Sequence, residues 1–289
     1  MQLNQKSIND RRNFIEKTSL GLFGICSFEK MAGIIPDKNN ENNQTLNKRY
    51  PAIDEELAYH TVNLAHFELE KVKALVTKRP ELANAAWDWG FGDYETAIGA
   101  CSHTGRRDIA EFLISYGARP DIFTFAMLGM LDSLKEIIET VPGIQSHRGP
   151  HGITLLKHAK NRLAKEDISG QDKSNVIKVV LYLEGLGNAN EGALSLELTE
   201  KDKTTYLGDY KFGNGETEIF NVAPYSFDPE NFLRIARKGL PGRLLHKIGD
   251  HTFSLTGAPS VKIVFDIKET KATTLTIYEP EPLVKAVRI

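Results

Sequence analysis

The sequence YETAIGACSHTGRRDIAEFLISYGARPD, residues 94–121, predicts two short helices joined by a tight turn. Thr96 is expected to begin the first helix, and Gly105 interrupts the helical pattern before the second. Gly117 ends the second helix, and Pro120 prevents its continuation. Helices this short cannot bury their own apolar faces, so we expect similar helix pairs on both sides of this stretch.

The spacing of these signals resembles an ankyrin repeat. Thr96 stands where that repeat has its helix-starting threonine, Gly105 stands at its inter-helix turn, and Gly117 belongs to its closing Gly-Ala pair. The resemblance implies an α-helical ankyrin-repeat array, in which paired helices stack side by side into one slab. Such an array is a rigid scaffold, and the resemblance names neither a ligand nor a reaction.

The neighbouring sequence repeats the pattern in weaker form, at residues 59–82 and again at residues 122–143. A further unit covers residues 152–190, with a polar insertion at residues 165–174 between its helices. We therefore expect an ankyrin-repeat array of about four units over residues 48–192.

The sequence from residue 193 onward changes from a helical period to an alternation of apolar and polar residues, seen most clearly at residues 261–268. Turn signals such as Gly213–Gly215 and Gly257–Pro259 separate the expected strands. Residues 193–289 are therefore predicted to form an antiparallel β-sheet or small barrel. The chain has 289 residues, enough for about two domains, and the expected fold class is a two-domain α+β protein.

This carboxy-terminal segment resembles the small β-domain appended to some penicillin-binding-protein-like (β-lactamase-related) serine hydrolases. The resemblance depends on residues 206–210 (YLGDY), residues 249–253 (GDHTF) and residues 286–288 (AVR). It covers about a third of the chain and carries no catalytic residue. The Ser-x-x-Lys sequence Ser27–Lys30 lies in or beside the leader, where no active-site cleft can form.

The amino-terminal residues 1–47 are expected to be an export signal followed by a solvated linker. Arg11 and Arg12 precede a short, weakly apolar run at residues 20–26, which resembles a bacterial twin-arginine export signal. That run is too short to span a bilayer, so no membrane span is expected in the mature chain. A functional leader implies a periplasmic or secreted protein. An amphipathic or disordered tail, the alternative, implies a cytoplasmic one.

The composition excludes some partners. The chain has 36 Lys and Arg against 38 Asp and Glu, a formal net charge of −2, so no broad basic face for nucleic acid is expected. Of its two cysteines, Cys26 lies in the leader and Cys101 in a predicted buried helix, so no disulfide is expected.

The sequence contains no local motif of a catalytic nucleophile, a zinc protease helix or a phosphate-binding loop, so neither a catalytic residue nor a cofactor is predicted. His147 and His151 are four residues apart, but Gly149 and Pro150 prevent a helix from placing both on one face. With no cysteine or nearby carboxylate to complete a ligand set, no metal site is predicted there.

The long connections at residues 84–93 and 146–152 are expected to emerge along one edge of the array. Exposed aromatic side chains in such loops would supply contact area at low entropic cost. The residues predicted to bind a partner, another protein, are Trp87, Asp88, Trp89, Phe91, Tyr94, His103, Arg106, His147, Arg148, His151 and His158. Alternatively, the aromatic residues fold inward and seal the end of the array.

The leading hypothesis is an exported ankyrin-repeat protein-interaction module. The alternative is a cell-envelope enzyme or enzyme accessory with a pocket between the repeat array and the β-domain, motivated by the resemblance of the last third to a hydrolase-associated domain. A third interpretation is a structural spacer, which the two tryptophans make less attractive.

Overall fold

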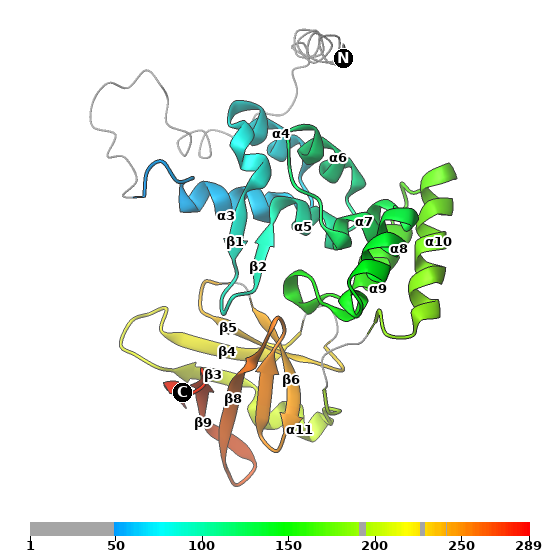
Figure 1. The fold of residues 1–289 in the computed structure, drawn as a ribbon. Helices are drawn as coiled ribbons and strands as arrows, with labels where there is room; N and C mark the ends of the chain where they lie inside the picture. The colour runs from blue at the N-terminus through cyan, green and yellow to red at the C-terminus, as the bar shows by residue number, and fades with distance from the viewer. Residues whose placement is uncertain (1–48, 191–194, 226–228, 241) are drawn as a thin grey trace, which may run out of the picture. The chain divides into compact units, whose positions relative to one another are not determined.

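The computed structural model describes residues 49–190, 195–225, 229–240 and 242–289 (Figure 1). The predicted export signal lies outside the described residues. Residues 53–289 form one compact unit, and the description below concerns these residues.

The first part of this unit is helical (Figure 1). Its helices are α3 (Glu55–Leu64), α4 (Leu69–Lys78), α5 (Ala97–His103), α6 (Arg107–Ser115), α7 (Ile122–Leu128), α8 (Leu131–Thr140), α9 (Leu155–Leu163), α10 (Gly170–Leu186) and α11 (Glu200–Tyr206). Between them lie the 3-10 helices η1 (Pro80–Asn84), η2 (Ile144–Ser146) and η3 (Pro150–Gly152), and an antiparallel hairpin of β1 (Ala86–Asp88) and β2 (Tyr94–Thr96).

Side-chain caps fix where several of these helices begin. The Thr96 hydroxyl accepts a hydrogen bond from the backbone N–H of Gly99 at 3.0 Å, which satisfies a donor that the first turn of α5 leaves unpaired. A carboxylate oxygen of Asp121 does the same for α7, accepting from the backbone N–H of Thr124 at 2.9 Å. The helix start predicted at Thr96 is therefore confirmed, and the hydroxyl cap of Thr96 is its physical cause.

The predicted ankyrin-repeat array is wrong. In such an array each repeat contacts only its neighbours, so the unit holding α9 would be separated from α5 by α7 and α8. Instead α9 also contacts α5: the Asn161 side-chain amide donates to the backbone oxygen of His103 at 2.6 Å, and Arg162 donates to the backbone oxygen of Gly105 at 3.2 Å. The helix α10, with 17 residues, packs on α7, α8 and α9 together. The helices pack around one another and do not form a one-dimensional series.

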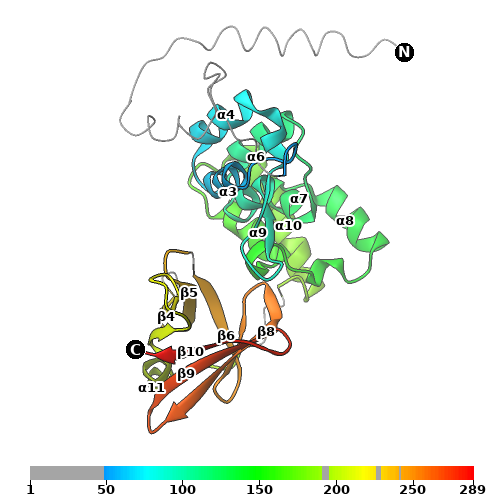
Figure 2. The ribbon, with the colours of Figure 1, turned by 90° about the vertical axis from the view of Figure 1, so that its left-hand side faces the viewer.

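The carboxy-terminal strands form a closed antiparallel barrel in the order β10-β3-β4-β5-β6-β7-β8-β9 (Figure 2). The strands are β3 (Gly208–Lys211), β4 (Ile219–Pro224), β5 (Leu233–Arg237), β6 (Arg243–Gly249), β7 (Thr252–Leu255), β8 (Ala258–Lys268), β9 (Lys271–Tyr278) and β10 (Pro282–Arg288). The ring closes where Val287 of β10 lies opposite Lys211 of β3. Closure leaves no unpaired sheet edge. Of the predicted fold class, the coarser statement fits: an α+β chain with helices before an antiparallel β part.

Large side chains fill the interior of the barrel. Tyr206, Tyr210 and Phe253 are fully buried, and the Tyr206 ring lies 4.9 Å from the rings of both Phe253 and Phe265, measured between centroids. The Tyr210 hydroxyl donates to the backbone oxygen of Tyr206 at 2.6 Å, so α11 is tied to the barrel core that it enters. An eight-stranded barrel has room inside for little more than its own side chains, and here they form a packed core.

Candidate metal centre

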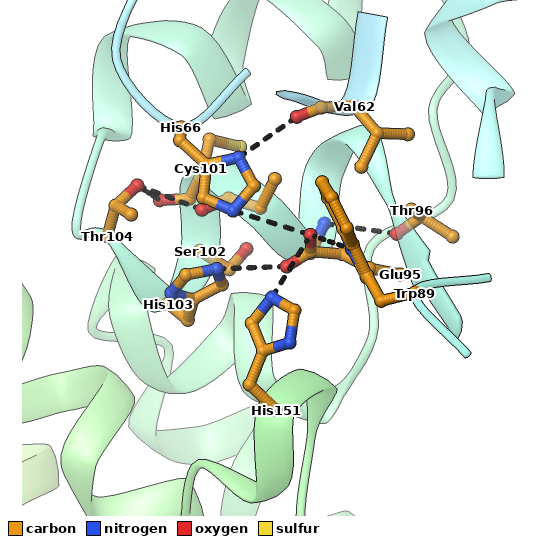
Figure 3. A network of polar contacts seen from close by, with 12 residues as sticks. Val62, His66, Trp89, Glu95, Thr96, Cys101, Ser102, His103, Thr104 and His151 are labelled. Atoms are coloured by element: carbon orange, nitrogen blue, oxygen red, sulfur yellow. Dashed lines mark hydrogen bonds and ion pairs between the residues drawn. The ribbon is translucent and has the colours of Figure 1, made fainter. Parts of the chain in front are cut away.

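Four side chains of the helical part converge on one point (Figure 3). His66, Glu95, His103 and His151 each place one nitrogen or oxygen atom within 4.8 Å of the others. His66 follows α3, Glu95 lies in β2, His103 ends α5 and His151 lies in η3. The Glu95 carboxylate is common to all three contacts: its oxygens lie 3.4 Å from His66 Nε2, 2.9 Å from His103 Nε2 and 3.5 Å from His151 Nε2.

The orientation of the His66 ring is set by the backbone of α3. Its Nδ1 atom lies 3.1 Å from the carbonyl oxygen of Val62 and 3.0 Å from that of Asn63. Carbonyl oxygens only accept hydrogen bonds, so Nδ1 carries a proton. In the neutral ring the Nε2 atom, which faces Glu95, then presents a lone pair.

His151 is held by a carboxylate. Its Nδ1 atom lies 3.0 Å from Oδ2 of Asp93, and its backbone N–H donates to Oδ1 of Asp93 at 2.9 Å. The residue has a left-handed backbone conformation, with φ of 58°, which costs a side-chain-bearing residue about 1 kcal/mol. The two bonds to Asp93 offset that cost and direct Nε2 toward Glu95. A carboxylate that orients a histidine in this way is a recurrent support of metal ligands.

Asp93 is itself fixed by a cation. Arg243 Nη2 of β6 lies 2.8 Å from Oδ2 of Asp93, and Arg243 Nη1 donates to the backbone oxygens of Trp89 at 3.3 Å and Gly90 at 3.2 Å. Burial would raise the pKa of Asp93, but the hydrogen bonds from His151 and the charge of Arg243 hold it below its usual range. Asp93 is therefore a charged, oriented support for His151.

Glu95 is the most buried member of the cluster, with a fully buried side chain. Its Oε2 atom accepts a hydrogen bond from the indole N–H of Trp89 at 2.9 Å. Its Oε1 atom lies 2.9 Å from Nε2 of His103 as an ion pair, and both are buried polar atoms without a hydrogen-bond partner. A buried polar atom without a partner is costly and calls for an explanation.

The charges of the cluster follow from these contacts. Burial opposes the charge of Glu95, but its contacts with His103 and His151 hold the pKa of this carboxyl well below its usual range. Burial would lower the pKa of His151, yet the hydrogen bonds to Asp93 and Glu95 raise it to about 9. Burial, opposed by the charge of Glu95, lowers the pKa of His66. At neutral pH the cluster therefore has a carboxylate, an imidazolium at His151 and a neutral imidazole at His66.

The distances in the cluster fit a metal ion. A tetrahedral zinc site with bonds of about 2.0 to 2.1 Å has its ligand atoms about 3.3 Å apart. Glu95 Oε2 lies 3.4 Å from His66 Nε2 and 3.5 Å from His151 Nε2, close to this value. The 2.9 Å distance to His103 Nε2 is from the other oxygen, Oε1, and the four ligand atoms lie within 4.8 Å of one another. Imidazole and carboxylate ligands suit zinc and the neighbouring first-row transition metals.

The residues predicted to bind a partner fall into separate environments. His103 and His151 belong to the cluster, and the Trp89 ring lies 6.3 Å from that of His66 and 5.8 Å from that of His151. Trp87 packs on Tyr59, with ring centroids 5.4 Å apart.

Other predicted residues do not supply any of the four ligand atoms. Asp88, Phe91, Tyr94, His147 and Arg148 are exposed. Arg106 pairs with Asp108 at 2.7 Å and also donates to the backbone oxygen of Phe67. His158 is fully buried, with its Nδ1 atom 2.8 Å from the Thr154 carbonyl oxygen, and burial lowers its pKa to about 4.

Residues that are close in sequence predict no metal site at His147 and His151. Gly149 and Pro150 do prevent a helix, but the 3-10 turn that they begin brings His151 to Asp93, 58 residues away. His66, Asp93 and Glu95 were not singled out from the sequence. The one local signal for them is the Asp-x-Glu spacing of 93 and 95, beside the two tryptophans.

No family model matches this sequence, and comparisons with curated proteins and with solved structures give no significant match. Among the described residues, no helix has both the length and the apolar character needed to cross a membrane.

Proposed function

We propose that this chain is a metal-binding protein in which His66, Glu95, His103 and His151 hold a divalent transition-metal ion, with zinc as the ion that the geometry fits best. The observation that carries the proposal is the fully buried carboxylate of Glu95, which faces three imidazole nitrogens at 2.9 to 3.5 Å. A cation between these atoms would bind both Glu95 Oε1 and His103 Nε2, which face each other at 2.9 Å and have no hydrogen-bond partner.

The competing explanation is a self-neutralised ion cluster without a metal. Asp93 and Glu95 supply two negative charges, and Arg243 and the imidazolium of His151 would balance them. That explanation accounts for His151 but not for His66. The neutral His66 ring points the lone pair of Nε2 at a carboxylate oxygen 3.4 Å away, and two acceptors repel each other. A metal ion between them turns this repulsion into two bonds.

The test is zinc binding by the full chain after treatment with a chelator. Isothermal titration calorimetry is expected to show one zinc per chain, with proton release because the imidazolium of His151 must lose its proton to coordinate. His103→Ala should abolish this binding. His147→Ala, which removes an exposed histidine four residues from a ligand, is the matched control and should bind zinc normally.

Two outcomes would overturn the proposal. Absence of zinc binding by the unmodified chain is the first, and equal binding by the His103→Ala and His147→Ala variants is the second. Circular dichroism of both variants separates loss of the site from loss of the fold.

Partner binding stays a second candidate, favoured by two exposed aromatic side chains in the β1–β2 hairpin region. Phe91 is 40% exposed and Tyr94 is 70% exposed. Because aromatic anchors dominate many interfaces, we expect that replacing both with Ser would weaken capture of a protein partner without loss of stability. Full retention of capture by that double variant would remove these two residues from the interface.

Export through the twin-arginine pathway also stays a prediction. Changing Arg11 and Arg12 to Lys should retain the precursor inside the cell. Unchanged secretion of that variant would contradict it.

A further inference from the structure

The geometry points to a metal ion that keeps an exchangeable coordination position on the open side of the cluster, where it takes a small anionic oxygen ligand such as a carboxylate or hydroxide. This inference rests on the proposed metal binding.

The histidine side chains of the cluster are more exposed than its carboxylate. The side chain of Glu95 is fully buried, whereas those of His103, His66 and His151 are 11%, 16% and 28% exposed. The three imidazoles line a cavity, together with Asn63, Phe67 and Trp89, and Glu95 does not. The carboxylate of Glu95 is thus the buried ligand of the site, and the three imidazoles lie between it and the cavity. The remaining face of a bound ion would be directed at the cavity.

The exchangeable position is a fifth one, because the four protein ligands would complete a tetrahedron. Zinc in catalytic sites is held by histidine and carboxylate ligands and can expand from four to five ligands, whereas structural sites, which use mainly cysteine thiolates, stay closed. The described part of the chain has one cysteine near the cluster, Cys101, and it is not available as a thiolate. Its thiol donates to the backbone oxygen of Ile98 at 3.1 Å, and burial raises its pKa.

The charge of the site favours an anion. A divalent ion with one carboxylate and three neutral imidazoles retains one positive charge. The other carboxylate nearby, Asp93, is already compensated by Arg243 at 2.8 Å. An anion at the open position would neutralise the remaining charge, and a bound water would lose a proton near neutral pH, since zinc lowers its pKa to about 7.

The test uses cobalt in place of zinc, because Co²⁺ has visible absorption bands that report its ligands. The full chain, loaded with one Co²⁺, is titrated with acetate, and separately with acetamide, its neutral isostere, with sodium perchlorate keeping the ionic strength constant. We expect a saturable change of the cobalt bands with acetate, at an affinity at least about tenfold higher than with acetamide, the charge being the only large difference.

The outcomes separate this inference from the proposed function. Cobalt bands that appear on loading but do not respond to acetate would overturn the open position and leave metal binding intact. A response that is equal for acetate and acetamide would overturn the preference for an anion. If cobalt bands appear neither in the unmodified chain nor in the His147→Ala control, both the open coordination position and the proposed metal binding would be overturned.

Discussion

The aromatic core of the barrel and the histidine–carboxylate cluster of the helical part differ in how their polar atoms are paired. In the barrel, the Tyr210 hydroxyl is bonded to the Tyr206 carbonyl at 2.6 Å, and the Tyr206 hydroxyl is 2.9 Å from Nδ1 of His251. In the helical part, Glu95 Oε1 and His103 Nε2 are buried and have no hydrogen-bond partner. Buried atoms without a hydrogen-bond partner also occur at His246 Nδ1 in β6 and at His158 Nε2, so such an atom alone does not mark a site. What distinguishes the cluster is that one buried carboxylate faces three imidazole nitrogens at 2.9 to 3.5 Å.

The largest effect is expected from breaking the barrel core. Phe253 is fully buried against Tyr206 and Phe265, so Phe253→Ala should lower the free energy of unfolding by about 3–5 kcal/mol. Zinc binding by the protein that remains folded should be unchanged. Denaturant titration measures the loss, and Phe91→Ala, at an exposed phenylalanine, is the control with a change of about 0.5 kcal/mol or less. A loss of zinc affinity in Phe253→Ala would contradict the interpretation that the barrel core supports stability and the histidine–carboxylate cluster binds the metal.

The next largest effect is expected at Glu95, the buried carboxylate ligand of the metal site. Glu95→Gln keeps the size of the side chain but removes its charge and one metal-binding oxygen, so zinc affinity should fall at least about 100-fold. Glu68→Gln, a change at a partly exposed carboxylate paired with Lys71, should have no effect on affinity. Competition with a chromophoric chelator measures both. Equal affinities would show that Glu95 is not a ligand.

The sequence predicted where individual helices and strands begin and end better than which of them pack against one another. Thr96 and Gly105 mark helix boundaries because a hydroxyl cap and a left-handed glycine act within one turn of the chain. The same signals say nothing about which helices meet, and the contact of Asn161 with the end of α5 is what contradicts the array. In the β part, the alternation at residues 261–268 predicted a strand, but the closure of β10 on β3 depends on pairing between distant segments.

The candidate site was missed for the same reason. Its ligands come from four separate elements, and the support of His151 by Asp93 joins residues 58 positions apart. No spacing rule for metal ligands on one helix or one turn describes such a set. His103 and His151 were predicted from the sequence to bind a protein partner, not a metal. The side chains that complete the set, His66 and Glu95, become visible only when the chain is folded.

A smaller effect is expected one step away from the ligands. Asp93→Asn retains the shape that orients His151 but loses the charge, so zinc affinity should fall about 10- to 100-fold. Asp88→Asn, at an exposed aspartate of the same hairpin, is the control. If the zinc affinity of Asp93→Asn is unchanged, Asp93 does not support His151 as a metal ligand, and its role is the ion pair with Arg243.

The smallest effect is the pH dependence of the metal-free protein. The pKa of His151 is raised to about 9 from 6.5, so its stabilising contribution is complete below about pH 6.5 and is lost as the pH rises through about 9. The free energy of unfolding should therefore fall over this range, by on the order of 1 kcal/mol. His151→Asn should flatten that slope. A slope that is equal in both proteins would assign the titration to another group.

The central claim, that three histidines and Glu95 hold a metal ion, is tested most directly by X-ray absorption at the zinc edge of the zinc-loaded full chain. The account predicts a shell of nitrogen and oxygen atoms at about 2.0–2.1 Å with the outer scattering of about three imidazole rings and no sulfur. A shell with sulfur, or one of water oxygens without imidazole scattering, would contradict it.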